Sequence, residues 1–270
     1  MIKTQQPIGV FDSGIGGLTV AAAISRLLPH EQLIYFGDTA HVPYGDKSVE
    51  LIGSYAERIT EFLLDEQKCK AIVIACNTAS AAAYSLLRDR YKGSVPVINV
   101  IDPMIEAVIA DDDIKSVGII ATKTTIASGI YQEKFSRRKP QLLFHPLATP
   151  LLASMIEEGF YNDNISSAVL EEYLSHESFK SIDGLVLACT HYPLIKKEID
   201  HFFKSKVKLF DSAEVVASKL KKILEAESLI NSERKDPNRF YVSDFTQSFE
   251  HSTKIFFGKQ VKLELMNLWK

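Results

Sequence analysis

Two cysteines follow apolar, β-type runs of nearly the same sequence. Residues 71–80 read AIVIACNTAS, in which Cys76 ends the run, and residues 184–193 read GLVLACTHYP, in which Cys189 does so. In open α/β sheets, ligands bind outside the carboxyl ends of the strands. Two thiols delivered in this way could face one small ligand from opposite sides.

Polar residues that are expected to begin a helix follow each cysteine. Asn77 and Thr78 come after the first thiol. Thr190 and His191 come after the second. A cysteine at the end of a buried strand is usually an inert small hydrophobe, but hydrogen-bond donors and a helix N-terminus lower the pKa of a thiol and yield a thiolate. The repetition therefore predicts two reactive thiols, and His191 could take or hold the proton of Cys189.

A glycine-rich turn, DSGIGG at residues 12–17, follows the first β-type run. Its Gly14-x-Gly16-x-x-Thr19 spacing lacks the third glycine of the dinucleotide-binding fingerprint. This weakens the NAD interpretation, although Asp38 follows the second run, where a ribose-binding acid would be expected. A glycine-rich turn before a helix also presents backbone N–H groups to an anion, and a substrate carboxylate would serve as well as a phosphate.

Asp12 ends the first run, close in the expected sheet order to the run that carries Cys76. An acid at this point could assist that thiol or bind an amino group. An aspartate that caps a helix or forms a turn is the structural alternative.

The elements that must position these residues alternate between strands and helices. Strands are expected at residues 8–11, 33–36, 71–76, 96–100, 117–121, 142–144, 184–189, 207–210 and 240–242. Helices are expected at residues 18–28, 48–67, 78–91, 102–110, from 122–125 toward 137, at 150–158, 165–174, from about 193, from a Ser212 cap onward, and at 245–256. This alternation indicates βαβ units and mainly parallel sheets, an α/β fold.

The two cysteine runs occupy matching places in two βαβ series. We therefore expect two similar α/β domains, related by a pseudo-two-fold axis through the cleft between them. The first domain is assigned to residues 1–98 plus 212–270 and the second to residues 99–211.

Composition excludes several classes of function. The 270 residues carry 31 basic and 34 acidic side chains, a net charge of −3, which gives no electrostatic case for nucleic acid or an anionic membrane. No apolar run approaches the roughly 20 residues of a membrane span, and the start of the chain has no signal-peptide core. Three cysteines without a CxxC pair argue against disulfides or a zinc site and for the reducing cytoplasm.

Four motifs in this order resemble those of the glutamate racemase family: DSGIGG at 12–17, PYG at 43–45, ACNTAS at 75–80 and CTHYPL at 189–194. The resemblance extends from about residue 8 to 211. It implies interconversion of L- and D-glutamate without a cofactor, which supplies D-glutamate for peptidoglycan. It also implies an active site between two α/β domains, often in a homodimer.

The resemblance also assigns residues. It makes Cys76 and Cys189 the two acid/base groups, assisted by Asp12 and His191. It implies an assisting glutamate at Glu157, with Glu158 as the adjacent alternative. The residues that would contact substrate are Asp12, Ser13, Tyr44, Gly45, Asn77, Thr78, Thr122, Thr125, Thr190 and His191.

Three other functions remain alternatives. One is a racemase for aspartate or a larger amino acid, although related aspartate racemases usually carry Glu where this chain has His191. Another is a hydrolase that uses Cys189 and His191, but residues two apart at one strand end rarely meet as nucleophile and base, and the second thiol would have no role. The third is a non-catalytic binding module.

Overall fold

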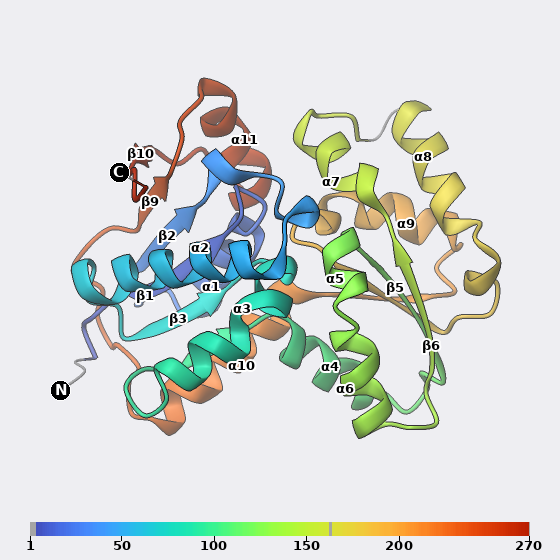
Figure 1. Cartoon of the computed structure of the whole chain (residues 1–270), viewed down its shortest axis with the longest axis horizontal. Coiled ribbons are helices and arrows are strands. Elements are labelled where there is room, and N and C mark those ends of the chain that lie inside the picture. The colour runs from blue at the N-terminus through green and yellow to red at the C-terminus, as the bar shows by residue number, and fades with distance from the viewer. Residues whose placement is uncertain (1–3, 162–163, 270) are drawn as a thin grey trace.

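The computed structural model describes residues 4–161 and 164–269, which build two parallel β-sheets with helices around them (Figure 1). The first sheet has the strand order β10-β9-β2-β1-β3-β4 and the second has the order β6-β5-β7-β8. The strands are β1 (Ile8–Asp12), β2 (Leu33–Gly37), β3 (Ala71–Ile74), β4 (Val97–Asn99), β5 (Ser116–Ala121), β6 (Leu143–Ala148), β7 (Gly184–Ala188), β8 (Lys208–Asp211), β9 (Arg239–Val242) and β10 (Leu263–Leu265). The predicted α/β fold class with two mainly parallel sheets is confirmed.

The two sheets repeat one topology. In the first, the strands that come first to fourth along the chain lie in the order β2-β1-β3-β4, and in the second the corresponding strands lie in the order β6-β5-β7-β8. In each sheet the order reverses between the first and third strands of the series. Ligands of such sheets bind at this switch point, outside the carboxyl ends. Both repeated cysteines follow the third strand of their series, so the topology brings each to a switch point.

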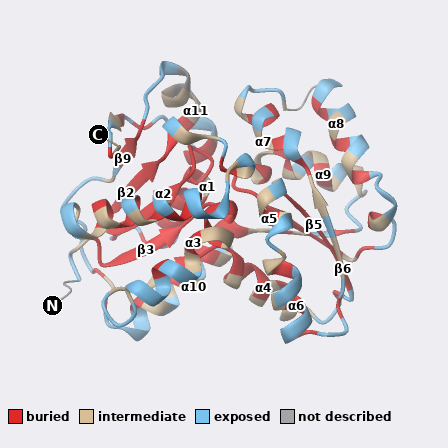
Figure 2. Cartoon of the chain, in the orientation of Figure 1, coloured by how far each residue is buried: buried red, intermediate tan, exposed pale blue. Residues whose placement is uncertain are grey.

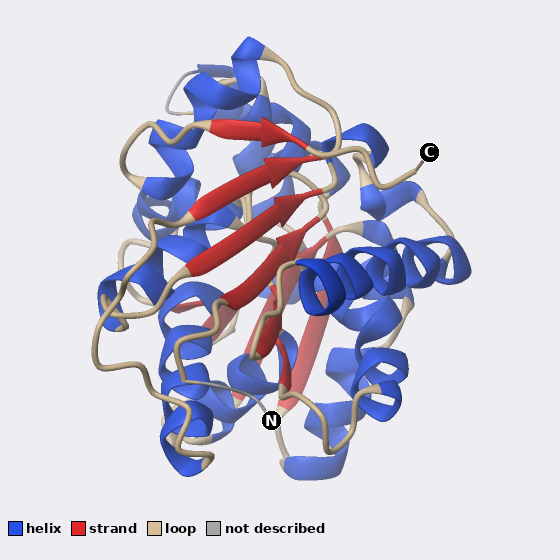
Figure 3. Cartoon of the chain, turned by 90° about the vertical axis from the view of Figure 1, so that its left-hand side faces the viewer, coloured by secondary structure: helices blue, strands red, loops and turns tan. Residues whose placement is uncertain are grey.

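Eleven α-helices lie within the described residues and cover these sheets. They are α1 (Leu18–Leu27), α2 (Val49–Glu61), α3 (Asn77–Arg90), α4 (Ile101–Ile109), α5 (Lys123–Ala127), α6 (Ile130–Arg138), α7 (Pro150–Glu157), α8 (Asn164–Leu174), α9 (Lys196–Phe202), α10 (Ser212–Ala226) and α11 (Gln247–Phe257). Figure 3 shows the strands of the first sheet running in one direction between helical layers. None of the helices in the described part of the chain is long and apolar enough to cross a membrane.

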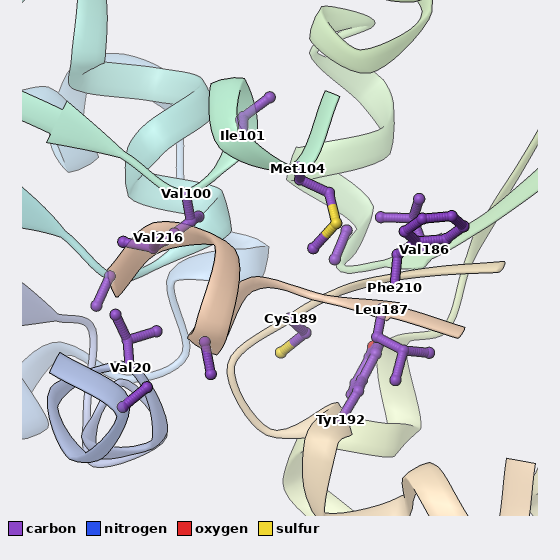
Figure 4. Close-up of a cluster of buried hydrophobic side chains, with 14 of the residues drawn as sticks. Val20, Val100, Ile101, Met104, Val186, Leu187, Cys189, Tyr192, Phe210 and Val216 are labelled. Carbon is purple, nitrogen blue, oxygen red and sulfur yellow. The ribbon is translucent and has the colours of Figure 1, made fainter. Parts of the chain in front are cut away.

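Two buried apolar clusters fill the space between strands and helices (Figure 2). The larger runs from one face of the first sheet, through α1, α4 and α10, into the second sheet. The smaller lies between the other face of the first sheet and helices α2 and α3. Figure 4 shows Cys189 in the larger cluster, beside Leu187 and Tyr192. The site residues are therefore anchored in both clusters, Cys189 in the larger and Cys76 and Tyr44 in the smaller.

Several element boundaries differ from the expectation for local reasons. Asp211, not Ser212, caps α10, because the Asp211 carboxylate accepts a hydrogen bond from the backbone N–H of Ala213. Strand β6 continues through Pro146 to residue 148, because it is an edge strand, where proline is tolerated. Strand β10 was not predicted at all. As expected, Ser48 caps α2 by accepting from the N–H of Leu51.

Strands β9 and β10 pair beside β2, so the end of the chain belongs to the first sheet. The second sheet contains only strands between residues 116 and 211. Helices α4 and α10 follow the last strands before the chain passes from one sheet to the other, and these two helices pack against each other. The division into residues 1–98 plus 212–270 and 99–211 stays a prediction.

Candidate active site

A small pocket of about 40 Å³ is lined by residues that belong to both sheets and the segments after their strands. Its lining residues are Ser13, Val42, Pro43, Tyr44, Gly45, Cys76, Asn77, Thr78, Thr122, Ala153, Ser154, Glu157, Ala188, Cys189, Thr190 and His191. Three hollows, of about 980, 550 and 420 Å³, are larger, but neither Cys76 nor Cys189 lines any of them. The two largest are lined by many charged residues, several of which pair with one another. The candidate site is therefore identified by its polar side chains and not by its size.

Cys76 stands at the junction of β3 and α3. It is the N-cap of α3, and its Sγ accepts from the N–H of Ala79 at 3.4 Å and lies 3.6 Å from the hydroxyl of Ser13. Burial raises the pKa of Cys76 to about 12, and the charge of Asp12 acts in the same direction. The expectation that the helix N-terminus would lower this pKa was wrong, because desolvation outweighs the hydrogen bonds.

Cys189 lies beside a histidine–carboxylate pair. Its Sγ is 3.5 Å from Nδ1 of His191, and Nε2 of His191 is 2.8 Å from Oε1 of Glu157. The first contact is the one that would let His191 take or hold the proton of Cys189, although residues two apart at one strand end rarely meet in this way. Burial lowers the pKa of His191, but hydrogen bonds and charges from Cys189 and Glu157 raise it well above the usual 6.5. The ring of His191 therefore keeps its second proton to a higher pH than a free histidine, with Nδ1 directed at the sulfur of Cys189.

Asp12 and the glycine turn lie behind the part of the wall that Ser13 forms near Cys76. Oδ2 of Asp12 accepts from the N–H groups of Gly14 and Gly17 at 3.1 and 2.9 Å. Oδ1 is buried and has no hydrogen-bond partner within the described residues. Burial raises the pKa of Asp12, against the opposing charge of His191 and the backbone donors. The unpartnered oxygen can accept a proton or an ammonium hydrogen.

Asn77 presents a second unpartnered polar atom. The hydroxyl of Tyr131 donates to Oδ1 of Asn77 at 2.8 Å, which fixes the orientation of the amide. The Nδ2 group is then left buried without an acceptor among the residues that the structure describes. Because native proteins pair nearly all buried polar groups, an anionic ligand at this point would complete the site.

Three threonine hydroxyls gather where the N-termini of α3 and α5 approach each other. Oγ1 of Thr78 lies 3.0 Å from Oγ1 of Thr122 and 3.3 Å from Oγ1 of Thr125, and the last two are 3.0 Å apart. Thr122 also caps α5. Hydroxyl donors beside two helix N-termini suit a carboxylate, since the helix dipole favours negative charge there.

Tyr44 and Gly45 form the wall contributed by the loop after β2. The hydroxyl of Tyr44 donates to Oδ2 of Asp38 at 2.6 Å, and burial, reinforced by Asp38, raises the pKa of Tyr44. Asp38 is itself buried and also accepts from Ser243. Its oxygens are occupied by this network, so the arrangement does not suit a ribose-binding acid.

The structure gathers the residues that the sequence proposed. All of them line the pocket except Asp12 and Thr125, which are buried behind the wall. Glu158 is exposed, and Glu157 is the glutamate that contacts His191.

Other residues around the pocket were missed. Tyr131 lies on α6, far in sequence from the Asn77 that it orients, and carries no local signal. Gly16 was noted as part of the glycine-rich turn, but the need for glycine at this position comes from tertiary packing. A Cβ there would lie 2.6 Å from His191 and Thr190.

Replacing Glu157 by Gln is expected to lower the pKa of His191, because it removes the carboxylate from the Nε2 side. A raised pKa means that this pair stabilises the fold fully below pH 6.5 and loses its contribution as pH rises through the folded value. An NMR titration of His191, with unfolding measured across the same range, checks both effects. Glu158→Gln, one residue away and exposed, is the control, and an unchanged His191 pKa in Glu157→Gln would argue against the pairing.

Two parallel sheets that each carry a thiol at a switch point define a class of α/β protein suited to proton transfer on one small substrate. The chain belongs to the Asp/Glu/Hydantoin racemase family, whose sequence model matches residues 16–220.

Individual relatives extend this similarity over nearly the whole chain. The glutamate racemase of Syntrophus aciditrophicus is 43% identical over 256 residues, which are 94% of each chain. The structure of a Francisella tularensis glutamate racemase in complex with D-glutamate superposes with a TM-score of 0.91 at 40% identity, covering 98% of this chain and 99% of that one. A glutamate racemase isoform from Bacillus anthracis gives a TM-score of 0.92 at 35% identity, with 97% and 98% coverage.

Proposed function

We propose that this protein interconverts L- and D-glutamate by proton transfer at Cα between the thiols of Cys76 and Cys189. The observation that carries the proposal is the pair of thiols, one from each sheet, lining the same small pocket. Relatives at about 40% identity over nearly full length are glutamate racemases, which supports glutamate as the substrate.

The two thiols have different surroundings, and the proposed reaction uses one as the acid and the other as the base. Burial raises the pKa of Cys76 to about 12, so this group enters the reaction as a thiol able to give a proton. Cys189 is proposed to take a proton, beside the ring of His191, whose Nδ1 lies 3.5 Å from the Cys189 sulfur. If Cys189 faces the α-hydrogen of L-glutamate, this assignment describes the L-to-D direction. The two roles are exchanged in the D-to-L direction.

The carbanionic transition state needs donors that are already in place. The Nδ2 group of Asn77 and the hydroxyls of Thr78 and Thr122 supply them, beside the N-termini of α3 and α5. The hydroxyl of Thr125 lies behind these two hydroxyls, within hydrogen-bond distance of both. Pre-oriented donors in a site shielded from water stabilise developing charge strongly. The carboxyl group of Asp12, buried behind the pocket wall, would attract the substrate ammonium group, whose positive charge also favours the carbanion.

The reaction is proposed to need no cofactor. No lysine from the described residues lines the pocket, so a Schiff base with pyridoxal phosphate has no partner there. Within residues 4–161 and 164–269, no group of three or more His, Cys, Asp or Glu side chains could hold a metal ion. The donors described above take over the task of stabilising charge.

Substrate entry requires the pocket to widen. A volume of about 40 Å³ holds only about three water molecules, and glutamate is larger than that. We infer that the walls from the two sheets move apart to admit glutamate and then close on it. Closure would exclude water and strengthen every electrostatic contact in the site.

The wider biological assignments rest on the family resemblance. We propose that the D-glutamate supplies peptidoglycan synthesis, that the enzyme works in the cytoplasm, and that it forms a homodimer. The two α/β domains proposed for residues 1–98 plus 212–270 and 99–211 would provide the movement described above.

Incubation of the pure protein with L-glutamate in deuterium oxide, without added cofactor, tests the function. D-glutamate carrying deuterium at Cα is the expected product, because the proton delivered comes from a thiol that exchanges with solvent. Chiral chromatography with mass spectrometry measures both features. Product without deuterium would refute proton exchange, and the absence of D-glutamate would refute the function.

A further inference from the structure

We propose that the C-terminal segment, residues 266–269, positions the pocket wall that contains Tyr44. The segment acts on this wall through Trp269, His41 and Asp38, and Trp269 thereby senses whether the pocket is occupied. This inference rests on the proposed function, because it assigns Tyr44 and Gly45 a role in binding glutamate. The segment lies beyond residue 220, where the match to the family model ends.

The first link joins the pocket wall to a buried carboxylate. Asp38 is fully buried and accepts from the hydroxyl of Tyr44 at 2.6 Å and from the hydroxyl of Ser243 at 2.7 Å. Its two oxygens also lie 2.9 and 3.0 Å from Nδ1 of His41. Three side chains from two segments therefore converge on one anion, and the position of Tyr44 depends on all of them.

The second link is a cluster of aromatic rings. His41 stacks on Tyr55 with ring centroids 4.2 Å apart and an interplanar angle of 21°. The indole of Trp269 packs edge-on against both, at 4.7 Å from His41 and 5.0 Å from Tyr55. Tyr55 also contacts the ring of Tyr44 at 5.8 Å. Trp269 therefore reaches the wall by two routes, one through the carboxylate and one through Tyr55.

The tail itself is held in place. The N–H of Met266 donates to the carbonyl of Val242 at 2.9 Å, and Nε of Arg58 donates to the carbonyl of Leu268 at 3.2 Å. The side chain of Leu268 is buried in the smaller core cluster. The indole N–H of Trp269 has no hydrogen-bond partner in the described part of the chain, so packing alone fixes the ring.

The same wall, at Gly45, also contacts the start of α5, the helix that follows β5 of the second sheet. The hydroxyl of Thr124 donates to the carbonyl of Gly45 at 2.7 Å. A Cβ on Gly45 would lie 2.9 Å from Cβ of Thr122, so the loop fits closely against the start of α5. Any widening of the pocket must shift this contact. The movement would pass through Tyr44 and His41 to Trp269.

Steady-state kinetics of Trp269→Ala test the positioning role. Because Tyr44 and Gly45 would bind substrate and transition state alike, KM for glutamate should rise roughly three- to tenfold while kcat changes little. Trp269→Phe should restore most of the wild-type KM, since it keeps an aromatic ring and loses no hydrogen bond. Leu265→Ala, at the end of β10 directly before this segment and with an exposed side chain, should leave KM unchanged.

Loss of the fold would lower kcat through a smaller active fraction and leave KM unchanged, and thermal denaturation would detect it. Unchanged KM in Trp269→Ala, or a KM that Trp269→Phe does not restore, overturns the positioning role.

Fluorescence tests the sensing role, because Trp269 is the only tryptophan in the sequence. Glutamate added to the Cys76→Ser, Cys189→Ser double variant, which should bind without turnover, is expected to change the emission in a saturable way. His41→Ala should remove most of that change. This inference alone would be rejected if the wild-type protein racemises glutamate, the double variant shows no change in emission with glutamate, and Trp269→Ala has an unchanged KM. A wild-type protein without turnover would reject the proposed function and, with it, this inference.

Discussion

Serine in place of either Cys76 or Cys189 is expected to abolish racemisation, with a loss of roughly 10²- to 10⁴-fold in kcat, the range that acid–base groups contribute. The substitution exchanges sulfur for oxygen and keeps the shape of the side chain. A serine hydroxyl does not ionise near neutral pH, so one of the two proton transfers lacks its group. Polarimetry or circular dichroism of glutamate in both directions measures the loss.

The chain contains a matched control for these variants. Cys69 is buried like the other two cysteines but does not line the pocket. Cys69→Ser applies the same chemical change to a third buried thiol, so its racemisation should match the wild type. Substantial turnover in Cys76→Ser or Cys189→Ser, with the fold intact, would contradict the mechanism in which both thiols take part.

Each single variant retains one thiol and should retain chemistry on one enantiomer. With β-chloroglutamate, removal of the α-hydrogen leads to loss of chloride, so only one base is needed. By the family resemblance, Cys76→Ser should process the L isomer and Cys189→Ser the D isomer. The same enantiomer preference in both variants would be inconsistent with thiols on opposite faces.

Gly16→Ala is expected to lower kcat/KM by about 100-fold, because displacement of a reacting group by about an ångström has costs of this size. A Cβ at this position would lie 2.6 Å from both the ring of His191 and the hydroxyl of Thr190. The ring cannot retreat freely, since Glu157 holds its Nε2 at 2.8 Å and Phe256 packs edge-on against it at 5.4 Å. The methyl group would therefore shift His191 away from Cys189.

Gly53→Ala is the control for that variant. Gly53 lies inside α2, and an added Cβ would meet only Leu86 at an ordinary 3.9 Å. The change should leave the rate unaltered and stabilise the helix by roughly 0.5–1 kcal/mol. If Gly16→Ala also kept the wild-type rate, close packing between the glycine turn and His191 would not matter for catalysis.

The strands that carry the cysteines could be predicted because their residues signal their state locally. Buried parallel strands appear as continuous apolar runs, and the repeated run before Cys76 and Cys189 disclosed the duplication. Strand β10 gave no such signal. It has three residues and pairs only with β9 at the edge of the sheet, so tertiary context creates it. Edge strand β6 is half exposed and contains proline, so its last residues lack the apolar run that would have predicted a strand.

The candidate site was predictable as a set of residue types but not as an electrostatic environment. Motif positions identified Cys76, Cys189, His191 and the residues that follow the strands. The pKa of Cys76 depends on complete burial beside Asp12, which no local pattern expresses. The network of Asp38, His41 and Trp269 joins residues more than 200 positions apart, so only the folded chain brings it together.

A crystal structure of the protein with bound glutamate would test the central claim most directly. The account predicts that the sulfur atoms of Cys76 and Cys189 lie on opposite faces of the substrate Cα, each within about 3–4 Å, the separation of a near-attack geometry. Both sulfurs on one face, or either one well outside that range in a closed complex, would contradict it.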